Sequence, residues 1–183
     1  MNESQDGARP LLLIDVDGPL NPYRARWARR YGYTSHRMWP SVWSARHAEG
    51  SRALRRGLRV RLRAADGPRL LALPYTPVWA TTWAHEANEM IAPALGIGEP
   101  LPVIEWPRLF EADPEGLYWK TRYVVAWAAG RPFAWIDDMV TALDVRYVAE
   151  THGPHALLLR VDPRTGLRET HWERLREWAG TVA

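Results

Sequence analysis

Two apolar runs, each ending in carboxylates, constrain the fold of this chain more than any other feature of its sequence. Residues 11–18 read LLLIDVDG, and residues 133–138 read FAWIDD. A short and nearly continuous apolar run that stops at a turn is typical of a buried parallel strand. Because the C-terminal ends of parallel strands share one edge of a sheet, we expect the carboxylates that follow the two strands to converge there. They belong to Asp15, Asp17, Asp137 and Asp138.

The rest of the chain alternates between strand-like and helix-like segments. Further strands are expected over residues 77–82, 101–106 and 155–161, and helices over residues 83–95, 119–129, 139–150 and 169–179. Such alternation predicts an α/β fold in which helices cover both faces of a mainly parallel, five-stranded sheet. A length of 183 residues suits one core, so we expect residues 1–183 to form a single domain.

A basic segment interrupts the alternation after the first strand. Residues 21–70 carry thirteen arginines against Glu49 and Asp66. Positive charge beside a site attracts phosphate esters, nucleotides or nucleic acid, whereas the alternative interpretation is a solvated arginine surface. We expect this segment to form a small flap over the site. The expected division is a flap over about residues 21–67 and a core over residues 11–20 and 68–183.

Aromatic residues alternate with arginines inside the flap. They are Tyr23, Arg24, Trp27, Tyr31, Trp39 and Trp43, and His36 lies among them. Such a mixture can stack bases and pair with phosphates, although the rings can also pack the flap onto the core. Residues 58–63 alternate arginine with apolar residues, which predicts a strand with one basic face. We take Arg24 and His36 as candidate substrate contacts.

A single lysine, Lys120, stands among the 24 basic residues of the chain. Where arginine is so strongly preferred, this exception suggests a site that needs a compact ammonium group rather than a planar guanidinium, although chance is the alternative. Converging carboxylates repel one another unless a cation lies among them, and oxygen ligands suit Mg²⁺. The sequence therefore implies a bound magnesium ion.

Four short segments that contain the candidate site residues follow one another along the chain. They are LLLIDVDGPL at residues 11–20, PVWATTW with Thr81, YWKTRY with Lys120 and FAWIDDMV at residues 133–140. Together they resemble the four motifs of the haloacid dehalogenase superfamily. The resemblance implies a three-layer, Rossmann-like fold with a five-stranded sheet. No large cap fits between residues 83 and 119, so the chain is similar to capless or small-flap members, some of which are associated with RNA repair modules.

The resemblance also implies catalytic roles. Asp15 would be the nucleophile that forms an aspartyl-phosphate, and Asp17 would protonate the leaving group and then activate water. Thr81 and Lys120 would hold the phosphoryl oxygens, with the neighbouring Thr82 as the alternative hydroxyl. The chemistry of these residues agrees, because phosphoryl transfer needs an in-line nucleophile and neutralisation of the equatorial oxygens.

The metal ligands follow from the same resemblance. Mg²⁺ would be held by Asp15, by Asp17 through its backbone carbonyl, and by the pair that follows the strand near residue 137. Within that pair, Asp137 and Asp138 are alternative direct ligands. We expect Lys120 to lower the pKa of Asp15 and to keep its carboxylate ionised, because an opposite charge favours the charged form.

These features predict a Mg²⁺-dependent phosphomonoester hydrolase whose substrate is a phosphorylated small molecule such as a nucleotide, or a nucleic-acid end. Asp17 favours ester hydrolysis over carbon–halogen cleavage, because an alkoxide leaving group benefits from a general acid. Two alternatives stay open. One is a non-catalytic module that binds a nucleotide or nucleic acid on the same fold, and the other is a carboxylate–metal nuclease that cleaves diesters internally.

Composition bears on the cellular compartment in which the protein is expected. The absence of cysteine excludes a disulfide framework and a thiolate metal site. The first ten residues lack a basic segment followed by an apolar one, and no run reaches the roughly 18 apolar residues of a membrane span. We therefore expect a soluble, cytoplasmic protein without a membrane partner, and the sequence leaves its oligomeric state open.

Overall fold

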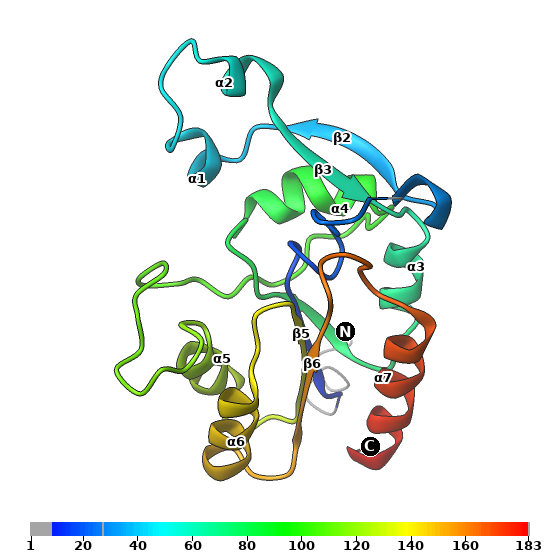
Figure 1. Cartoon of the computed structure of the whole chain (residues 1–183). Coiled ribbons are helices and arrows are strands. Elements are labelled where there is room, and N and C mark those ends of the chain that lie inside the picture. Colours follow the sequence, from blue (N-terminus) through cyan, green and yellow to red (C-terminus); the bar gives the residue numbers. More distant parts are fainter. Residues whose placement is uncertain (1–8, 27, 183) are drawn as a thin grey trace.

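A four-stranded parallel sheet lies at the centre of the computed structural model, which describes residues 9–26 and 28–182 (Figure 1). The strands are β1 (Leu11–Ile14), β4 (Thr76–Trp79), β5 (Phe133–Asp137) and β6 (Ala156–Arg160), in the order β4-β1-β5-β6. Every residue of the central strands β1 and β5 is buried, as their continuous apolar runs predict. Trp27 lies outside the described residues.

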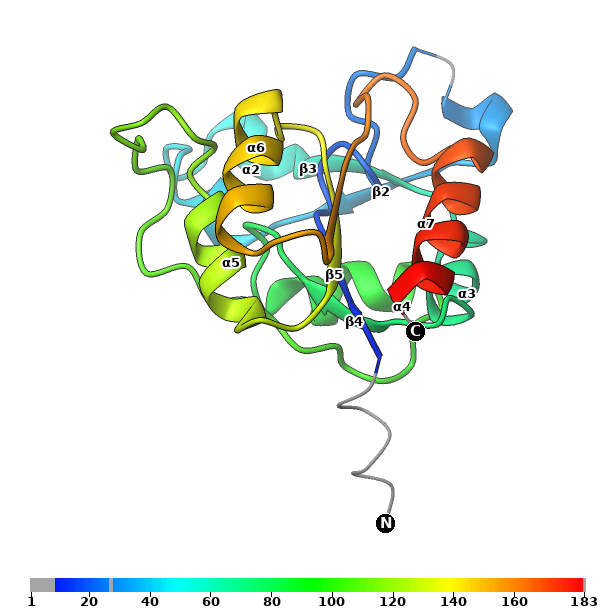
Figure 2. The same ribbon diagram turned by 90° about the horizontal axis from the view of Figure 1, so that it is seen from below.

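Helices cover both faces of this sheet, as the alternating pattern predicts (Figure 2). One face is covered by α5 (Thr121–Ala128) and α6 (Ala142–Thr151). The other face is covered by α3 (Asp66–Leu71), η2 (Ala87–Ile91), α4 (Ala92–Ala94) and α7 (Glu169–Val182). Successive side chains of β1 enter the two cores in turn, since Leu13 packs with Val124 on one face and Leu12 packs with Trp172 on the other. Within the described residues, no helix combines the length and apolar character that crossing a bilayer demands.

The expected fifth strand over residues 101–106 is wrong. This segment makes only an isolated parallel bridge, between Val103 and Trp79 at the edge of β4. Prolines at positions 100, 102 and 107 remove the backbone donors that a longer ladder needs. The side chain of Asn88 instead binds both backbone groups of Leu101, at 2.8 and 2.9 Å. The mainly parallel sheet therefore has four strands.

The expected helix over residues 83–95 is broken into pieces. Turns occupy its first part, a single π-helical stretch follows as η2, and α4 adds three residues. Gly96 ends the segment with φ +73°, the left-handed conformation that glycine adopts easily. The helices expected over residues 119–129, 139–150 and 169–179 correspond to α5, α6 and α7.

The segment between β1 and α3 contains a two-stranded antiparallel hairpin above the C-terminal edge of the sheet (Figure 1). Its strands are β2 (Thr34–Met38) and β3 (Leu58–Leu62), and its short helices are η1 (Ala28–Tyr31), α1 (Ser41–Ser44) and α2 (Arg52–Arg56). Met38, Val60 and Leu62 join the core on the α7 face. The hairpin is therefore packed onto the sheet layer rather than separate from it.

The arginines of β3 do not form one free basic face. Arg61 donates to the carbonyl oxygens of Pro22 and Tyr23, at 3.2 and 3.0 Å. Arg63, which follows the strand, pairs with buried Asp66 at 2.8 Å and lies 5.0 Å from the ring of Tyr33. These two guanidinium groups fasten the hairpin to the core. Arg61 does so through hydrogen bonds to backbone carbonyls, and Arg63 does so through an ion pair.

A buried carboxylate, that of Asp144, connects α5 to α6. One of its oxygens accepts hydrogen bonds from the Tyr118 backbone N–H and the Thr121 hydroxyl, at 2.8 and 2.7 Å. The other accepts from the backbone N–H and hydroxyl of Thr141, which completes a capping box at the start of α6. Asp144 therefore fixes the segment that leads into Lys120.

We predict that Asp144→Ala lowers the free energy of unfolding by about 3 kcal/mol, because it leaves several buried donors without an acceptor. Glu150→Ala, an exposed change on the same helix, is the control and should shift stability by less than about 0.5 kcal/mol. Urea unfolding followed by circular dichroism measures both. Equal stability of the two variants would contradict the role given to Asp144.

Candidate functional site

The C-terminal ends of β1, β4 and β5 emerge side by side at one edge of the sheet. Ile14, the last residue of β1, is in register with the ends of both neighbouring strands. The residues that follow are Asp15, Ala80 and Asp137. The convergence predicted from the two carboxylate-ended runs is thus present, because parallel strands in register deliver their ends to one place.

The ammonium group of Lys120 joins these three strand ends. Its Nζ lies 3.1 Å from Asp15 Oδ1 and 3.0 Å from Asp137 Oδ2, and it donates to the carbonyl oxygen of Ala80 at 2.9 Å. The side chain is only 1% exposed. Three donors with three oxygen partners satisfy the ammonium group fully, which a buried charge requires.

Aromatic rings surround the same ammonium group on its other sides. The ring centroids of Trp106, Tyr118 and Trp119 lie 5.6 to 5.9 Å from Lys120 Nζ, within the range of cation–π attraction. This enclosure leaves room for a compact group. It gives a structural reason for lysine, rather than arginine, at position 120.

Three buried carboxylates gather beside Lys120. Asp15, Asp137 and Asp138 each place one oxygen within 4.8 Å of the others. Asp137 also accepts from the backbone N–H of Met139 at 2.9 Å, and Asp138 accepts from the hydroxyl of Tyr23 at 2.8 Å. One ammonium group cannot neutralise three carboxylates, so the cluster fits a hard divalent cation bound through oxygen.

Burial is the largest single influence on the pKa values of Asp15 and Lys120. Burial raises the pKa of Asp15 well above its usual value, by more than Lys120 lowers it. The expected lowering of the Asp15 pKa by Lys120 is therefore present, but burial outweighs it. Burial by itself lowers the pKa of Lys120. The neighbouring carboxylates of Asp137 and Asp15 raise it by more, so the net pKa lies above its ordinary value and the ammonium group stays charged.

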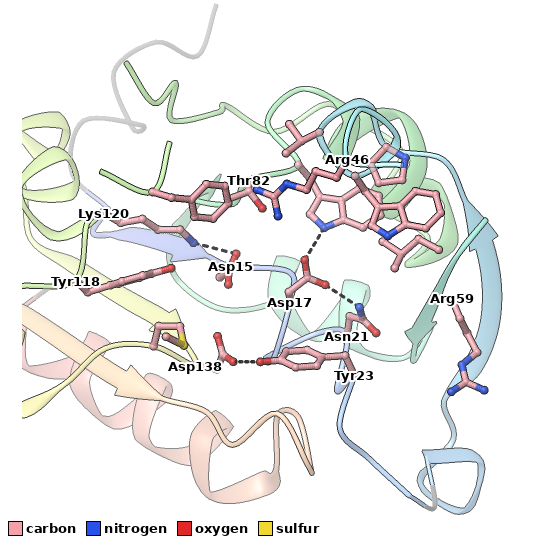
Figure 3. A pocket seen from close by; sticks show the side chains of 17 residues that line it. Asp15, Asp17, Asn21, Tyr23, Arg46, Arg59, Thr82, Tyr118, Lys120 and Asp138 are labelled. Carbon is pink, nitrogen blue, oxygen red and sulfur yellow. Dashed lines mark hydrogen bonds and ion pairs between the residues drawn. The ribbon is translucent and has the colours of Figure 1, made fainter. Parts of the chain in front are cut away.

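Asp17 points away from the carboxylate cluster and toward the flap side (Figure 3). Its oxygens accept hydrogen bonds from Asn21 Nδ2 at 2.7 Å and from Trp83 Nε1 at 3.0 Å. Burial raises its pKa, against the lowering effect of these two donors. The side chain of Asp17 is thus set apart in position and partners from Asp15, as a group with a different task would be.

Gly18 allows the loop after β1 to pass directly against Asp138. Its φ is +100°, and an added Cβ would lie 2.5 Å from the Cβ of Asp138. Any side chain at this position would displace the carboxylate pair at the end of β5. The glycine of the DVDG segment is therefore required by both backbone conformation and space.

A cavity of about 410 Å³ opens above the carboxylates and reaches under the hairpin (Figure 3). Its core-side lining is Asp15, Asp17, Asn21, Tyr23, Thr82, Trp83, Phe110, Tyr118, Lys120, Asp138 and Met139, and its hairpin-side lining is Pro40, Val42, Trp43, Arg46, Leu58 and Arg59. A cavity of this size accommodates a small organic ligand. The hairpin thus forms one wall of the site.

Two segments meet at the mouth of this cavity. The guanidinium of Arg46, beyond α1, lies 4.8 Å from the ring centroid of Phe110. Phe110 has φ +62°, a strained conformation for a non-glycine residue, although half of its surface is exposed. The ring of Trp43 lines the same space. An aromatic and cationic rim therefore surrounds the entrance.

The two candidate threonines lie in different environments. Thr82 is half-buried and lines the cavity, whereas Thr81 is fully buried and is not part of the lining. The hydroxyl oxygen of Thr81 lies 3.4 Å from the backbone N–H of Trp83, and its carbonyl accepts from Trp106 Nε1 at 2.9 Å. The resemblance implies Thr81 with Thr82 as the alternative, and access to the cavity favours Thr82.

The two other candidate substrate contacts lie outside the cavity. Arg24 is exposed, with its guanidinium 5.8 Å from the ring centroid of Tyr23, and lines a neighbouring hollow. His36 lies on β2 with Nε2 2.9 Å from the hydroxyl oxygen of Thr34. The structure therefore brings Asp15, Lys120 and the aspartates of β5 together, but it does not bring His36 to them.

Several cavity residues were not singled out in the sequence as contacts of the site, although Tyr23 was named among the flap aromatics. Asn21 and Tyr23 lie shortly after the first motif, and Tyr118 lies two residues before Lys120. Proximity to a motif in the sequence was a usable signal for these three. Arg46 belongs to the basic segment that was expected over the site, whereas Phe110 had no signal, because it reaches the cavity from a segment far from any motif.

Comparison of the chain with protein-family models, curated proteins and solved structures finds no match. Its function therefore has to be argued from the residues of the site.

We predict that Lys120→Met lowers the free energy of unfolding at neutral pH by about 3–5 kcal/mol, because it leaves buried carboxylates without their ammonium partner. The loss should shrink as the pH is lowered, since protonation removes the uncompensated charge. Arg176→Met, which breaks an exposed pair with Glu169, is the control and should cost less than about 1 kcal/mol. Urea unfolding between pH 5 and 7 measures this, and a loss equal to that of the control would contradict the assignment.

Proposed function

We propose that this chain is a Mg²⁺-dependent phosphomonoester hydrolase that acts through Asp15. The observation that carries the proposal is that Asp15, Asp17, Lys120 and Asp138 line one cavity (Figure 3), while the buried Asp137 contacts Lys120 at 3.0 Å. The same residues carry the resemblance to the haloacid dehalogenase superfamily. The parallel order β4-β1-β5-β6 is compatible with the Rossmann-like layout of that superfamily.

In the proposed reaction, a carboxylate oxygen of Asp15 attacks the phosphorus atom, and the bond between phosphorus and the leaving oxygen breaks. Asp17 gives its proton to that oxygen, so an alcohol leaves and an aspartyl-phosphate remains on Asp15. A water molecule then attacks the phosphorus and gives a proton to Asp17, and the bond between phosphorus and the Asp15 oxygen breaks. Inorganic phosphate leaves, and both carboxyl groups return to their starting states.

The pKa directions support this division of labour. Burial raises the pKa of Asp17, which favours the protonated form that a general acid needs. Asp15 must be ionised to attack, although burial raises its pKa as well. Lys120 counteracts that effect from 3.1 Å. A bound Mg²⁺ would add positive charge here and would neutralise the phosphoryl oxygens.

The contacts of the β5 aspartates favour different roles for the two. Both oxygens of Asp137 already have protein partners, which are Lys120 and the backbone N–H of Met139. Asp138 is held by Tyr23 through one oxygen. We assign Asp15 and Asp138 as direct ligands of the cation and Asp137 mainly as the group that positions Lys120. The backbone carbonyl of Asp17 remains a proposed ligand.

The rim of the cavity favours a leaving group with a planar ring. Trp43 and Phe110 contribute aromatic side chains to the lining, and Arg46 and Arg59 contribute positive charge. Such a combination suits a base and a phosphate, so a nucleotide or a nucleic-acid end is the proposed substrate. The cytoplasmic setting expected from the sequence is part of the same proposal.

We predict Mg²⁺-dependent release of inorganic phosphate from a panel of nucleotides, sugar phosphates and end-phosphorylated oligonucleotides. Asp15→Asn should abolish release, and Asp17→Asn should lower kcat by about 10²–10⁴-fold, the usual contribution of a general acid. Glu173→Gln, an exposed change on α7, is the control and should behave as the unaltered protein. Acid quenching during turnover should leave a phosphoryl group on Asp15, detectable by mass spectrometry.

The other two functions predict different results in this experiment. A binding module would release no phosphate from any substrate but would retain affinity for nucleotides in the Asp15→Asn variant. A nuclease would cut oligonucleotides internally and leave no phosphoryl group on the protein. Either result would replace the phosphatase proposal.

We further predict that Thr82→Val lowers kcat/KM by about a hundredfold, the usual effect of losing one donor to a developing oxyanion. Thr81→Val is the matched control, because it removes the same hydroxyl one residue away, outside the cavity. Its kcat/KM should change by less than tenfold. The reverse order of effects would return the role to Thr81.

A further inference from the structure

Two more hollows lie beside the cavity, and the nearer of them lies between the loops that follow β1 and β6. The second hollow, of about 310 Å³, shares Tyr23, Asp138 and Met139 with the cavity. The third, of about 380 Å³, shares Arg24 and Arg164 with the second. We call the second and third hollows together the arginine path. The arginine path begins beside the carboxylate cluster and ends beside η1.

The arginine path is lined by much more positive than negative charge. Its five arginines are Arg24, Arg26, Arg160, Arg164 and Arg168, whereas its carboxylates are Asp138 and Asp162, both in the second hollow. Both carboxylates are already engaged. Asp138 accepts from Tyr23, and Asp162 accepts from the backbone N–H of Arg164 at 2.8 Å and faces the guanidinium of Arg164 at 4.0 Å. Among the described residues, none of those that line the third hollow is acidic.

Most of these guanidinium groups have no carboxylate partner. Within the described residues, Arg24, Arg26, Arg160 and Arg168 form no ion pair with an acidic side chain. This contrasts with Arg63, whose charge is used to fasten the hairpin. Unpaired positive charge along a hollow that leads to a phosphate-binding site suits a chain of phosphates.

Exposed aromatic rings accompany the positive charge. Tyr23 is 43% exposed where the arginine path meets the cavity, and Tyr31 is 63% exposed in the third hollow. Rings that alternate with arginines can stack successive bases while the guanidinium groups pair with the backbone. Groups of both kinds are needed for a single strand, whereas a free phosphate needs only the charge.

We infer that the arginine path binds a single-stranded nucleic acid whose terminal phosphate lies at Asp15, so that the end of a strand is the substrate rather than a free nucleotide. A free nucleotide would fill the cavity alone and would gain nothing from the arginine path. The position of the terminal phosphate rests on the proposed function. Binding of the strand to the arginine path does not, because it requires no turnover.

The test measures binding to the catalytically blocked Asp15→Asn protein. The probes are single strands of about 12 nucleotides, within the site sizes of single-strand binding proteins, with fluorescein at one end and phosphate at the other, in both polarities. Fluorescence anisotropy gives Kd between 50 and 200 mM salt. The path variant adds Arg26→Gln and Arg168→Gln. The control adds Arg52→Gln and Arg56→Gln, an equal change of charge on exposed α2 residues outside all three hollows.

We expect the path variant to weaken binding on the order of tenfold at 0.1 M salt and to lower the slope of log Kd against log salt by about 1.4, or about 0.7 for each lost phosphate contact. The control should keep the slope of the parent protein. Equal losses in both variants, or no loss in the path variant, would overturn the inference. Thermal unfolding of each protein separates loss of binding from loss of folding.

Failure of the inference can be told apart from failure of the proposed function. Release of phosphate from para-nitrophenyl phosphate by the unaltered protein tests the chemistry without using the arginine path. If the protein releases phosphate but the path variant binds strands as well as the control does, the proposed phosphatase activity stands and the inference about the arginine path is rejected. If the path variant binds strands more weakly than the control but no substrate is turned over, the inference about the arginine path stands and the proposed phosphatase activity is rejected.

Discussion

The rest of this structure depends on one buried ammonium group. Lys120 Nζ contacts the ends of β1, β4 and β5 at once, so it ties three strands together at the edge where the site forms. Removing a charged group from water is costly, and only full pairing makes it tolerable. The two carboxylates that pair with Lys120 are therefore stabilised by it and hold it in place. Because three carboxylates gather around a single ammonium group, the cluster stays short of positive charge, which is the condition that favours a divalent cation.

The parts of the site that could be predicted are those fixed by strand register. Two apolar runs that end in carboxylates, Asp15 and Asp137, can meet at one edge only if the strands are parallel and adjacent, as β1 and β5 are. The fifth strand failed because an apolar run does not reveal whether its backbone donors are available, and the prolines at 100, 102 and 107 remove them. The balance of effects on the pKa of Asp15 could not be predicted for a related reason, because the sequence does not show the depth of burial that outweighs Lys120.

The arginines show a second limit of sequence reasoning. Thirteen of them lie between residues 21 and 70, which pointed to the flap as the basic surface. In the structure Arg61 and Arg63 are used to attach the hairpin, so their charge is largely committed. The arginine path is lined instead by arginines from the loop after β1, from the end of β6 and from the loop after β6, and residues 160–168 carry no basic run that stands out in the sequence. Local charge counts describe a segment, whereas a binding surface is assembled from several segments.

This arrangement divides the positive charge of the protein into three kinds with different physical consequences. The charge of Lys120 is buried and balanced, so it acts on reacting atoms at short range, where water does not screen it. The charges of Arg61 and Arg63 are consumed within the fold and act on stability. The charges of the arginine path face solvent, where salt screens them, so they can contribute strength only through many simultaneous contacts. A ligand that is bound both by Lys120 and by the arginine path must carry one phosphate at its end and further phosphates along its length. That requirement distinguishes a nucleic-acid end from a single nucleotide more sharply than the shape of the cavity does.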